Sequence, residues 1–195
     1  MFSLLFPGQG SQHMGMAKEL YDNFDYIRKL FEEADDLLKY KISEIIFEGP
    51  TEKLNSTQHT QPAIFLTSYS IYLTIYKDTN FDASKAEFFA GHSLGEYSAL
   101  CCAESLNFKD TLLLLRDRGN AMNNVVKNGN GGMVAILGAD KNKVDQLLSD
   151  NQDDFKCYIA NDNSPGQIVV SGELKNLELL QSTIVFDDLA ITFEK

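Results

Sequence analysis

The residues with the clearest chemical potential lie in the stretch Gly91-His92-Ser93-Leu94-Gly95, which fits the pattern G-x-S-x-G. In this pattern a serine occupies a sharp turn between a strand and a helix, and the glycines permit a backbone that larger side chains would block. The turn exposes the hydroxyl, and the N-terminus of the next helix can stabilise an oxyanion. We therefore predict Ser93 as a nucleophile and the Leu94 N–H as an oxyanion donor. The alternative is a glycine-rich turn in which Ser93 only caps the helix.

A serine nucleophile needs a general base, which is most often a histidine. The chain has His13, His59 and His92, and none of them follows Ser93. In hydrolase-like folds with this turn, the histidine comes after the serine in the chain. His92 would need an unusual backbone to act as the base of its own neighbour. We expect His13 and His59 to be loop or surface residues.

The composition is that of a soluble globular protein, with 44% hydrophobic and 23% charged residues. The formal net charge of −11 argues against nucleic acid and against anionic membrane surfaces as partners. No apolar stretch approaches the ~20 residues that span a bilayer, and the N-terminus lacks the basic region of a secretory signal. The cysteines form no disulfide framework, and no spacing typical of a zinc site occurs. We therefore expect a cytoplasmic protein without a bound metal.

The apolar pattern changes at the glycine-rich segment KNGNGG. Before it, apolar strands at 2–6 and 85–90 would alternate with helices, which predicts an α/β domain over residues 1–127. After it, the expected order is β-α-β-β-α-β, which is typical of a ferredoxin-like domain and is assigned to residues 128–195. Within this second domain, the segment NDNSPG at 161–166 is expected to form a tight turn.

Several short motifs stand in the order and at the spacings of one family. They are FPGQGSQ at 6–12, TQPAIF at 60–65, GHSLGEYSAL at 91–100, RG at 118–119 and NSPGQIVVSG at 163–172. On these motifs the chain resembles the malonyl-CoA:acyl carrier protein transacylases of fatty acid synthesis and, more distantly, the acyltransferase domains of polyketide synthases. The resemblance covers nearly the whole chain. It implies an α/β-hydrolase-like large domain that carries a ferredoxin-like small domain.

The resemblance also implies how the serine turn works. Ser93 would take the malonyl group from the CoA thioester. The backbone N–H groups of Gln9 and Leu94 would bind the tetrahedral oxyanion, because amides fixed in place cost no reorganisation as charge develops. His92 is expected to belong to the catalytic site together with Ser93, and its role there would be to support the turn.

Three polar residues outside the turn acquire substrate-binding roles from the resemblance. Arg118 would pair with the malonyl carboxylate, for which a guanidinium fork is well suited. Taken alone, an arginine on an amphipathic helix would be expected to face solvent. Gln61 and Asn161 would line the substrate cleft.

The reaction implied by the resemblance is the ping-pong transfer of a malonyl group to the phosphopantetheine thiol of acyl carrier protein. Malonyl-CoA and acyl carrier protein would be the partners of a monomer that needs no metal or redox cofactor. In the family, the chain returns from the small domain to the large one and there supplies the catalytic histidine. Because this chain stops at Lys195, we expect a C-terminally truncated member that lacks the histidine and has little transferase activity alone.

Two alternatives remain. One is a serine hydrolase or thioesterase with the same turn, which would have no use for a buried Arg118. The other is an inactive fragment that only binds CoA or acyl carrier protein.

Overall fold

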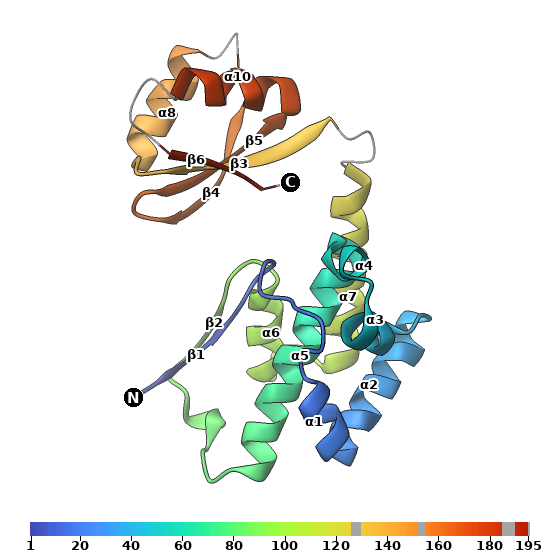
Figure 1. Ribbon diagram of the computed structural model, residues 1–195. Helices are drawn as coiled ribbons and strands as arrows, with labels where there is room; N and C mark the ends of the chain where they lie inside the picture. Colours follow the sequence, from blue (N-terminus) through green and yellow to red (C-terminus); the bar gives the residue numbers. More distant parts are fainter. Residues whose placement is uncertain (126–129, 152–154, 185–189, 195) are drawn as a thin grey trace. The chain divides into compact units, whose positions relative to one another are not determined.

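The computed structural model describes residues 1–125, 130–151, 155–184 and 190–194 (Figure 1). The chain divides into two compact units, Met1–Asn124 and Val125–Lys195. The domain boundary predicted between residues 127 and 128 lies outside the described residues. Both units combine helices with strands, so the predicted mixed α/β fold is confirmed.

The first unit contains two strands, β1 (Ser3–Phe6) and β2 (Phe88–Gly91), which pair in parallel. Phe6 is opposite Gly91 at the carboxyl end of the pair. Because parallel strands end at the same edge of a sheet, the loops that follow them leave from the same place. This register brings the loop after Phe6 next to the serine turn.

The α-helices of this unit lie to one side of the strand pair (Figure 1). They are α1 (Lys18–Asn23), α2 (Asp25–Leu38), α3 (Ile42–Glu48), α4 (Thr51–Asn55), α5 (Thr57–Asp78), α6 (Gly95–Cys102) and α7 (Phe108–Val125), and a 3-10 helix covers Ala83–Lys85. The amphipathic α2 buries one face, with Phe31 stacked on Phe47 at a centroid distance of 5.2 Å. Residues 60–66 of α5 are all buried, so this helix runs through the core of the unit.

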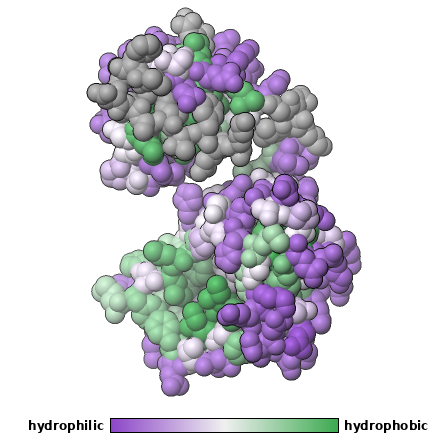
Figure 2. Space-filling model, viewed as in Figure 1, coloured by the Kyte–Doolittle hydropathy of each residue, from purple (hydrophilic) through white to green (hydrophobic). Residues whose placement is uncertain are grey.

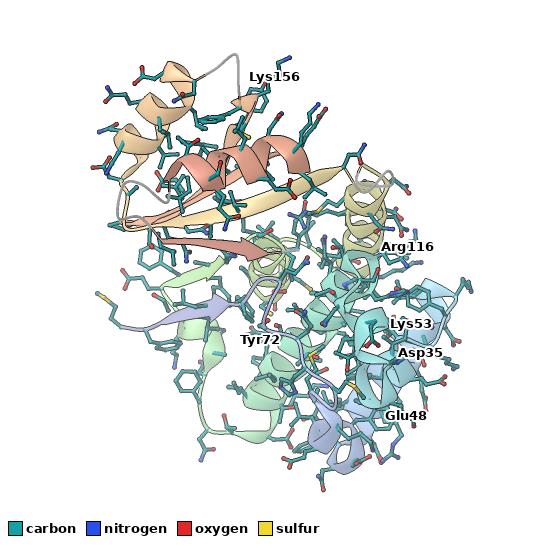
Figure 3. The ribbon with its side chains drawn as sticks, turned by 45° about the horizontal axis from the view of Figure 1, so that its top comes forward. Asp35, Glu48, Lys53, Tyr72, Arg116 and Lys156 are labelled. Carbon is teal, nitrogen blue, oxygen red and sulfur yellow. The ribbon has the colours of Figure 1, made fainter. Side chains whose placement is uncertain are left out.

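An apolar groove of about 330 Å³ lies between β1 and α5. Tyr72 of α5 lines it and packs edge-on against Phe89 of β2 (Figure 3). Leu5 at the groove is 78% exposed and Phe88 on β2 is 62% exposed. Figure 2 shows hydrophobic residues gathered on the surface of the first unit. This is an unusual amount of exposed apolar surface for a small sheet.

The second unit is a four-stranded antiparallel sheet with helices packed on it. Its described elements are β3 (Gly131–Leu137), α8 (Lys141–Asp150), β4 (Tyr158–Ser164), β5 (Gln167–Glu173), α10 (Leu174–Ile184) and β6 (Ala190–Glu194). The strands lie in the order β4-β5-β3-β6. Alternate residues of β3 and β5, such as Val134 and Val170, are buried against helix residues that include Leu177.

The prediction of a tight turn over residues 161–166 is wrong for most of that segment. Residues 161–164 belong to β4, where Asn161 pairs with Val169 of β5. The turn itself is confined to Pro165 and Gly166, and Gly166 has a φ of 84°. Cross-strand pairing therefore overrides the turn preference of Asn and Asp here.

No helix in the described part of the chain is long and apolar enough to cross a bilayer.

Candidate active site

The serine turn connects β2 to α6, and its two glycines are required by close backbone contacts. A Cβ on Gly91 would lie 2.0 Å from the carbonyl carbon of Gly95. A Cβ on Gly95 would lie 2.4 Å from the carbonyl oxygen of Phe6. Both distances are far below van der Waals contact, and the atoms they meet are backbone. The turn therefore excludes any larger residue at either position.

Ser93 itself adopts a left-handed backbone, with a φ of 56°. This conformation is strained for a residue with a Cβ and persists only where the surroundings fix it. Hydrogen bonds on both sides do so: the N–H of His92 donates to Phe6 O at 3.1 Å, and the N–H of Glu96 donates to Ser93 O at 3.1 Å. The result is a serine held at the exit of a strand with its hydroxyl half-buried.

Leu94 anchors the start of α6. Its side chain is 1% exposed and belongs to the core of the first unit. Its N–H has no hydrogen-bond acceptor among the described residues, as is usual for the first amides of a helix. Such an amide can bind an anionic oxygen near Ser93.

The loop after β1 packs against the serine turn. A Cβ on Gly8 would lie 2.7 Å from Nδ1 of His92, so only glycine permits this approach. Gln9 follows directly and is exposed, and its Nε2 donates to Oγ1 of Thr57 at 3.4 Å. The packing keeps the Gln9 segment beside the turn, although Gln9 and Ser93 share no hydrogen bond there.

Arg118 points at the serine. Its Nη2 donates to Ser93 Oγ at 3.0 Å, and its Nη1 donates to Oε1 of Gln61 at 2.6 Å. The expectation that this arginine taken alone would face solvent is therefore wrong. Arg116, two residues earlier on α7, contrasts with it, since it pairs with Asp117 at 2.8 Å and points away from β1 and β2 (Figure 3).

The approach of α7 to α5 explains how Arg118 reaches Gln61. A Cβ on Gly119 would lie 2.8 Å from the Cα of Gln58 and 2.8 Å from the carbonyl oxygen of Thr57. The two helices thus touch backbone to backbone at Gly119. Gln61, one turn further along α5, is fully buried, and its Oε1 accepts a hydrogen bond from the guanidinium of Arg118.

The positive charge of Arg118 has no ion-pair partner among the residues that the structure describes. In the described ranges no carboxylate lies within ion-pair distance of it, and its hydrogen bonds go to neutral oxygens. A half-buried guanidinium without a counter-ion can receive an anionic group bidentately. The arrangement therefore combines a serine hydroxyl with a site for a carboxylate or phosphate.

Two histidines engage groups other than the serine. Nδ1 of His13 lies 3.2 Å from Met14 O, and Nδ1 of His59 lies 3.1 Å from Lys53 O. Burial lowers the pKa of His59, which packs edge-on against Tyr40 at 5.3 Å. His92 is exposed and packs against Gly8. Asn161 is exposed on β4 of the second unit.

Two further residues of this site were missed by the sequence reasoning. The ring of Tyr97 lies under the guanidinium, with its centroid 5.8 Å from Cζ of Arg118. Met122 accepts a hydrogen bond at Sδ from Nε2 of Gln61 at 3.2 Å. Met122 follows Arg118 by four positions on α7, so helical periodicity could have found it, because residues i and i+4 share one face of a helix. Tyr97 gave no such signal, because Ser93 lies before the start of α6 in a left-handed conformation.

Neither metal ligands nor reactive thiols are found in the described part of the chain. No group of three or more His, Cys, Asp and Glu is placed there to hold a metal ion. Cys101, Cys102 and Cys157 are buried free thiols. Burial raises the pKa of Cys101 to about 11 and also raises that of Cys102.

Comparison with known proteins gives relatives over nearly the whole chain. Residues 3–188 match the acyl transferase domain family. Malonyl CoA-acyl carrier protein transacylase of Bacillus subtilis (strain 168) is 46% identical over 178 residues, which are 91% of this chain and 55% of that protein. The chain spans about half the length of the curated relatives it matches.

Solved structures give the same result. The acyl-carrier-protein-S-malonyltransferase of Bartonella henselae superposes with a TM-score of 0.90 at 41% identity, over 99% of this chain and 62% of that chain. A type II PKS acyl-carrier protein in complex with its malonyl-transacylase matches with a TM-score of 0.87 at 35% identity, over 99% and 62%. With a serine turn of this geometry and a family match over almost its full length, the chain belongs to the acyl transferase domain family.

Proposed function

We propose that this chain carries the acyl-accepting site of a malonyl-CoA:acyl carrier protein transacylase. The observation that carries the proposal is Arg118, whose guanidinium reaches Ser93 Oγ and has no carboxylate partner among the described residues. An acyl group that ends in a carboxylate would replace the hydrogen bond between the two, with its carbonyl at the serine and its charge on the arginine. The names of the Bacillus subtilis relative and of the solved complex support malonyl-CoA and acyl carrier protein as the partners.

The first half-reaction forms an ester on the serine. Ser93 Oγ attacks the thioester carbonyl, its proton passes to a base, and the CoA thiolate leaves. The backbone N–H groups of Gln9 and Leu94 hold the oxyanion of the tetrahedral intermediate. In the second half-reaction, the phosphopantetheine thiol of the carrier protein attacks the ester and regenerates Ser93.

Arg118 changes partner during this sequence. In the unliganded site Arg118 donates a hydrogen bond to Ser93 Oγ, and this bond withdraws electron density from the serine oxygen. The malonyl carboxylate takes over Nη2, while Gln61 keeps Nη1 and fixes the direction of the guanidinium. The serine is therefore released from the arginine when a substrate of the right charge is bound.

The finer assignments belong to the same proposal. The parallel strands and serine turn support an α/β-hydrolase-like large domain over residues 1–127. The strand order β4-β5-β3-β6 with its crossover helices supports a ferredoxin-like small domain over 128–195. Asn161 is proposed as a cleft residue from that domain, and His92 as a support of the turn. We also propose that the protein is a cytoplasmic monomer.

Acyl transfer to Ser93 is the test. The chain is incubated with malonyl-CoA or acetyl-CoA, and the adduct is located by mass spectrometry of the intact chain and of its peptides. Because none of the three histidines follows Ser93, we expect slow formation of malonyl-Ser93, so the incubation is long. We expect no adduct in Ser93→Ala, and loss of the preference for malonyl over acetyl in Arg118→Ala. Arg116→Ala, on the same helix, is the matched control and should label like the wild type.

Other outcomes identify the alternatives. Cleavage of neutral esters that survives in Arg118→Ala would favour a serine hydrolase. Binding of CoA without any adduct on Ser93 would favour a protein that only binds.

A further inference from the structure

The guanidinium of Arg118 is held by more than its two hydrogen bonds. Nη1 and Nη2 use the edge of the guanidinium plane, toward Gln61 and Ser93. The ring of Tyr97 approaches the same group, with Cζ 5.8 Å from the ring centroid. This distance falls within the range of a cation–π contact.

Tyr97 is itself firmly placed. It lies in the first turn of α6, four residues after the serine, and its N–H donates to Leu94 O at 3.1 Å. Its side chain is half-buried and packs against the core of the first unit. An aromatic ring has few rotatable bonds, so it offers a rigid support to a long flexible side chain.

The support matters most when substrate is bound. In the proposed reaction, Ser93 exchanges its hydrogen bond from Arg118 for a bond to the acyl group. Among the described residues, Gln61 and Tyr97 then orient the guanidinium toward the malonyl carboxylate. A hydrogen bond to Gln61 through one nitrogen fixes a direction but permits rotation about it. Contact with a ring restricts that rotation.

We propose that Tyr97 is a positioning residue that holds the guanidinium of Arg118 toward Ser93 and thereby favours acyl groups that end in a carboxylate. This inference rests on the proposed function. Because the aromatic ring makes the contact with the guanidinium, Tyr97→Phe should keep Arg118 in place. Tyr97→Leu or Tyr97→Met should lose this positioning.

The first measurement reports the contact without any catalysis. In NMR spectra of the labelled chain, the side-chain signals of Arg118 are assigned by their loss in Arg118→Lys. We expect an upfield ring-current displacement of these signals in the wild type and in Tyr97→Phe, and its loss in Tyr97→Leu. The signals of Arg116, which bonds Asp117, serve as the internal control and should not respond.

The second measurement reports the consequence. Malonate is titrated into each variant as the probe for the carboxylate. We expect its dissociation constant to rise about threefold to fivefold in Tyr97→Leu and Tyr97→Met, and to stay within about twofold in Tyr97→Phe. Tyr76→Leu, an exposed tyrosine near the end of α5, is the matched control and should bind like the wild type.

The outcomes separate this inference from the proposed function. Arg118 signals without ring-current displacement in the wild type would overturn the role of Tyr97, even if every variant unfolded. Equal malonate binding by wild type and Tyr97→Leu, both folded by their amide spectra, would overturn it while leaving the proposed function intact. A wild-type chain that binds no malonate despite ring-shifted Arg118 signals would overturn both.

Discussion

The close contact between α5 and α7 at Gly119 makes Gly119→Ala a sharp test of how the site is built. In a helix without this contact, the substitution would stabilise by about 1 kcal/mol, because alanine is the better helix former. Here the new Cβ would lie 2.8 Å from two backbone atoms of α5, the Cα of Gln58 and the carbonyl oxygen of Thr57. Ordinary contact begins near 3.4 Å, so the helices must separate by roughly 0.6 Å.

Overpacking of this kind costs about 1–3 kcal/mol, which outweighs the gain in helix propensity. We therefore expect Gly119→Ala to lower the free energy of unfolding by about 0–2 kcal/mol. The separation also pulls Gln61 away from Nη1 of Arg118, a contact of 2.6 Å. Because small displacements at a reacting centre have large effects, we expect labelling of Ser93 by malonyl-CoA to slow about tenfold or more.

Urea unfolding and the rate of malonyl labelling are the assays. Asn120→Ala, at the next and exposed position of α7, is the control for helix propensity and should stabilise slightly without slowing the labelling. A Gly119→Ala chain that is more stable than the wild type and labels at the same rate would show that the α5–α7 contact does not position Arg118.

Three further predictions concern other groups. Since burial lowers the pKa of His59, the histidine binds a proton more readily in the unfolded chain, so the free energy of unfolding should fall as the pH drops below about 6.5. His59→Gln should flatten this part of a stability–pH curve, and an unchanged curve would contradict the assignment. The thiols of Cys101 and Cys102 should resist Ellman's reagent at pH 8 until the chain is unfolded, because burial raises the pKa of each; rapid reaction of the folded chain would contradict this. The apolar groove should bind anilinonaphthalene sulfonate, and Leu5→Ser together with Phe88→Ser should reduce the fluorescence markedly, whereas equal fluorescence would place the dye elsewhere.

Local patterns in the sequence are sufficient for the serine turn and for the order of elements in the second unit. Gly91 and Gly95 are separated by the length of one turn, and the close approach of Gly91 to Gly95 within such a short segment is set by the backbone itself. The contact of Gly95 with Phe6 O depends instead on the pairing of β1 with β2. The β-α-β-β-α-β order follows from hydrophobic periodicity, which depends on which face of each element is buried. Apart from the contacts with Phe6, both features involve neighbours in the chain.

Asn161 shows where local preference fails. Its segment has the composition of a turn, but hydrogen bonding to β5 draws it into β4. The sequence contains no local signal for the position of the partner strand.

Arg118 depends on tertiary structure to a still greater degree. The sequence by itself determined that a basic residue lies on a helix after the serine turn, and it could not distinguish Arg118 from Arg116 by physical pattern. Only the packing of α7 against α5 at Gly119 decided which of the two points at Ser93 and Gln61. The physical reason is that a side chain's partners on other elements are set by how close two backbones approach, and that distance is a property of the folded core.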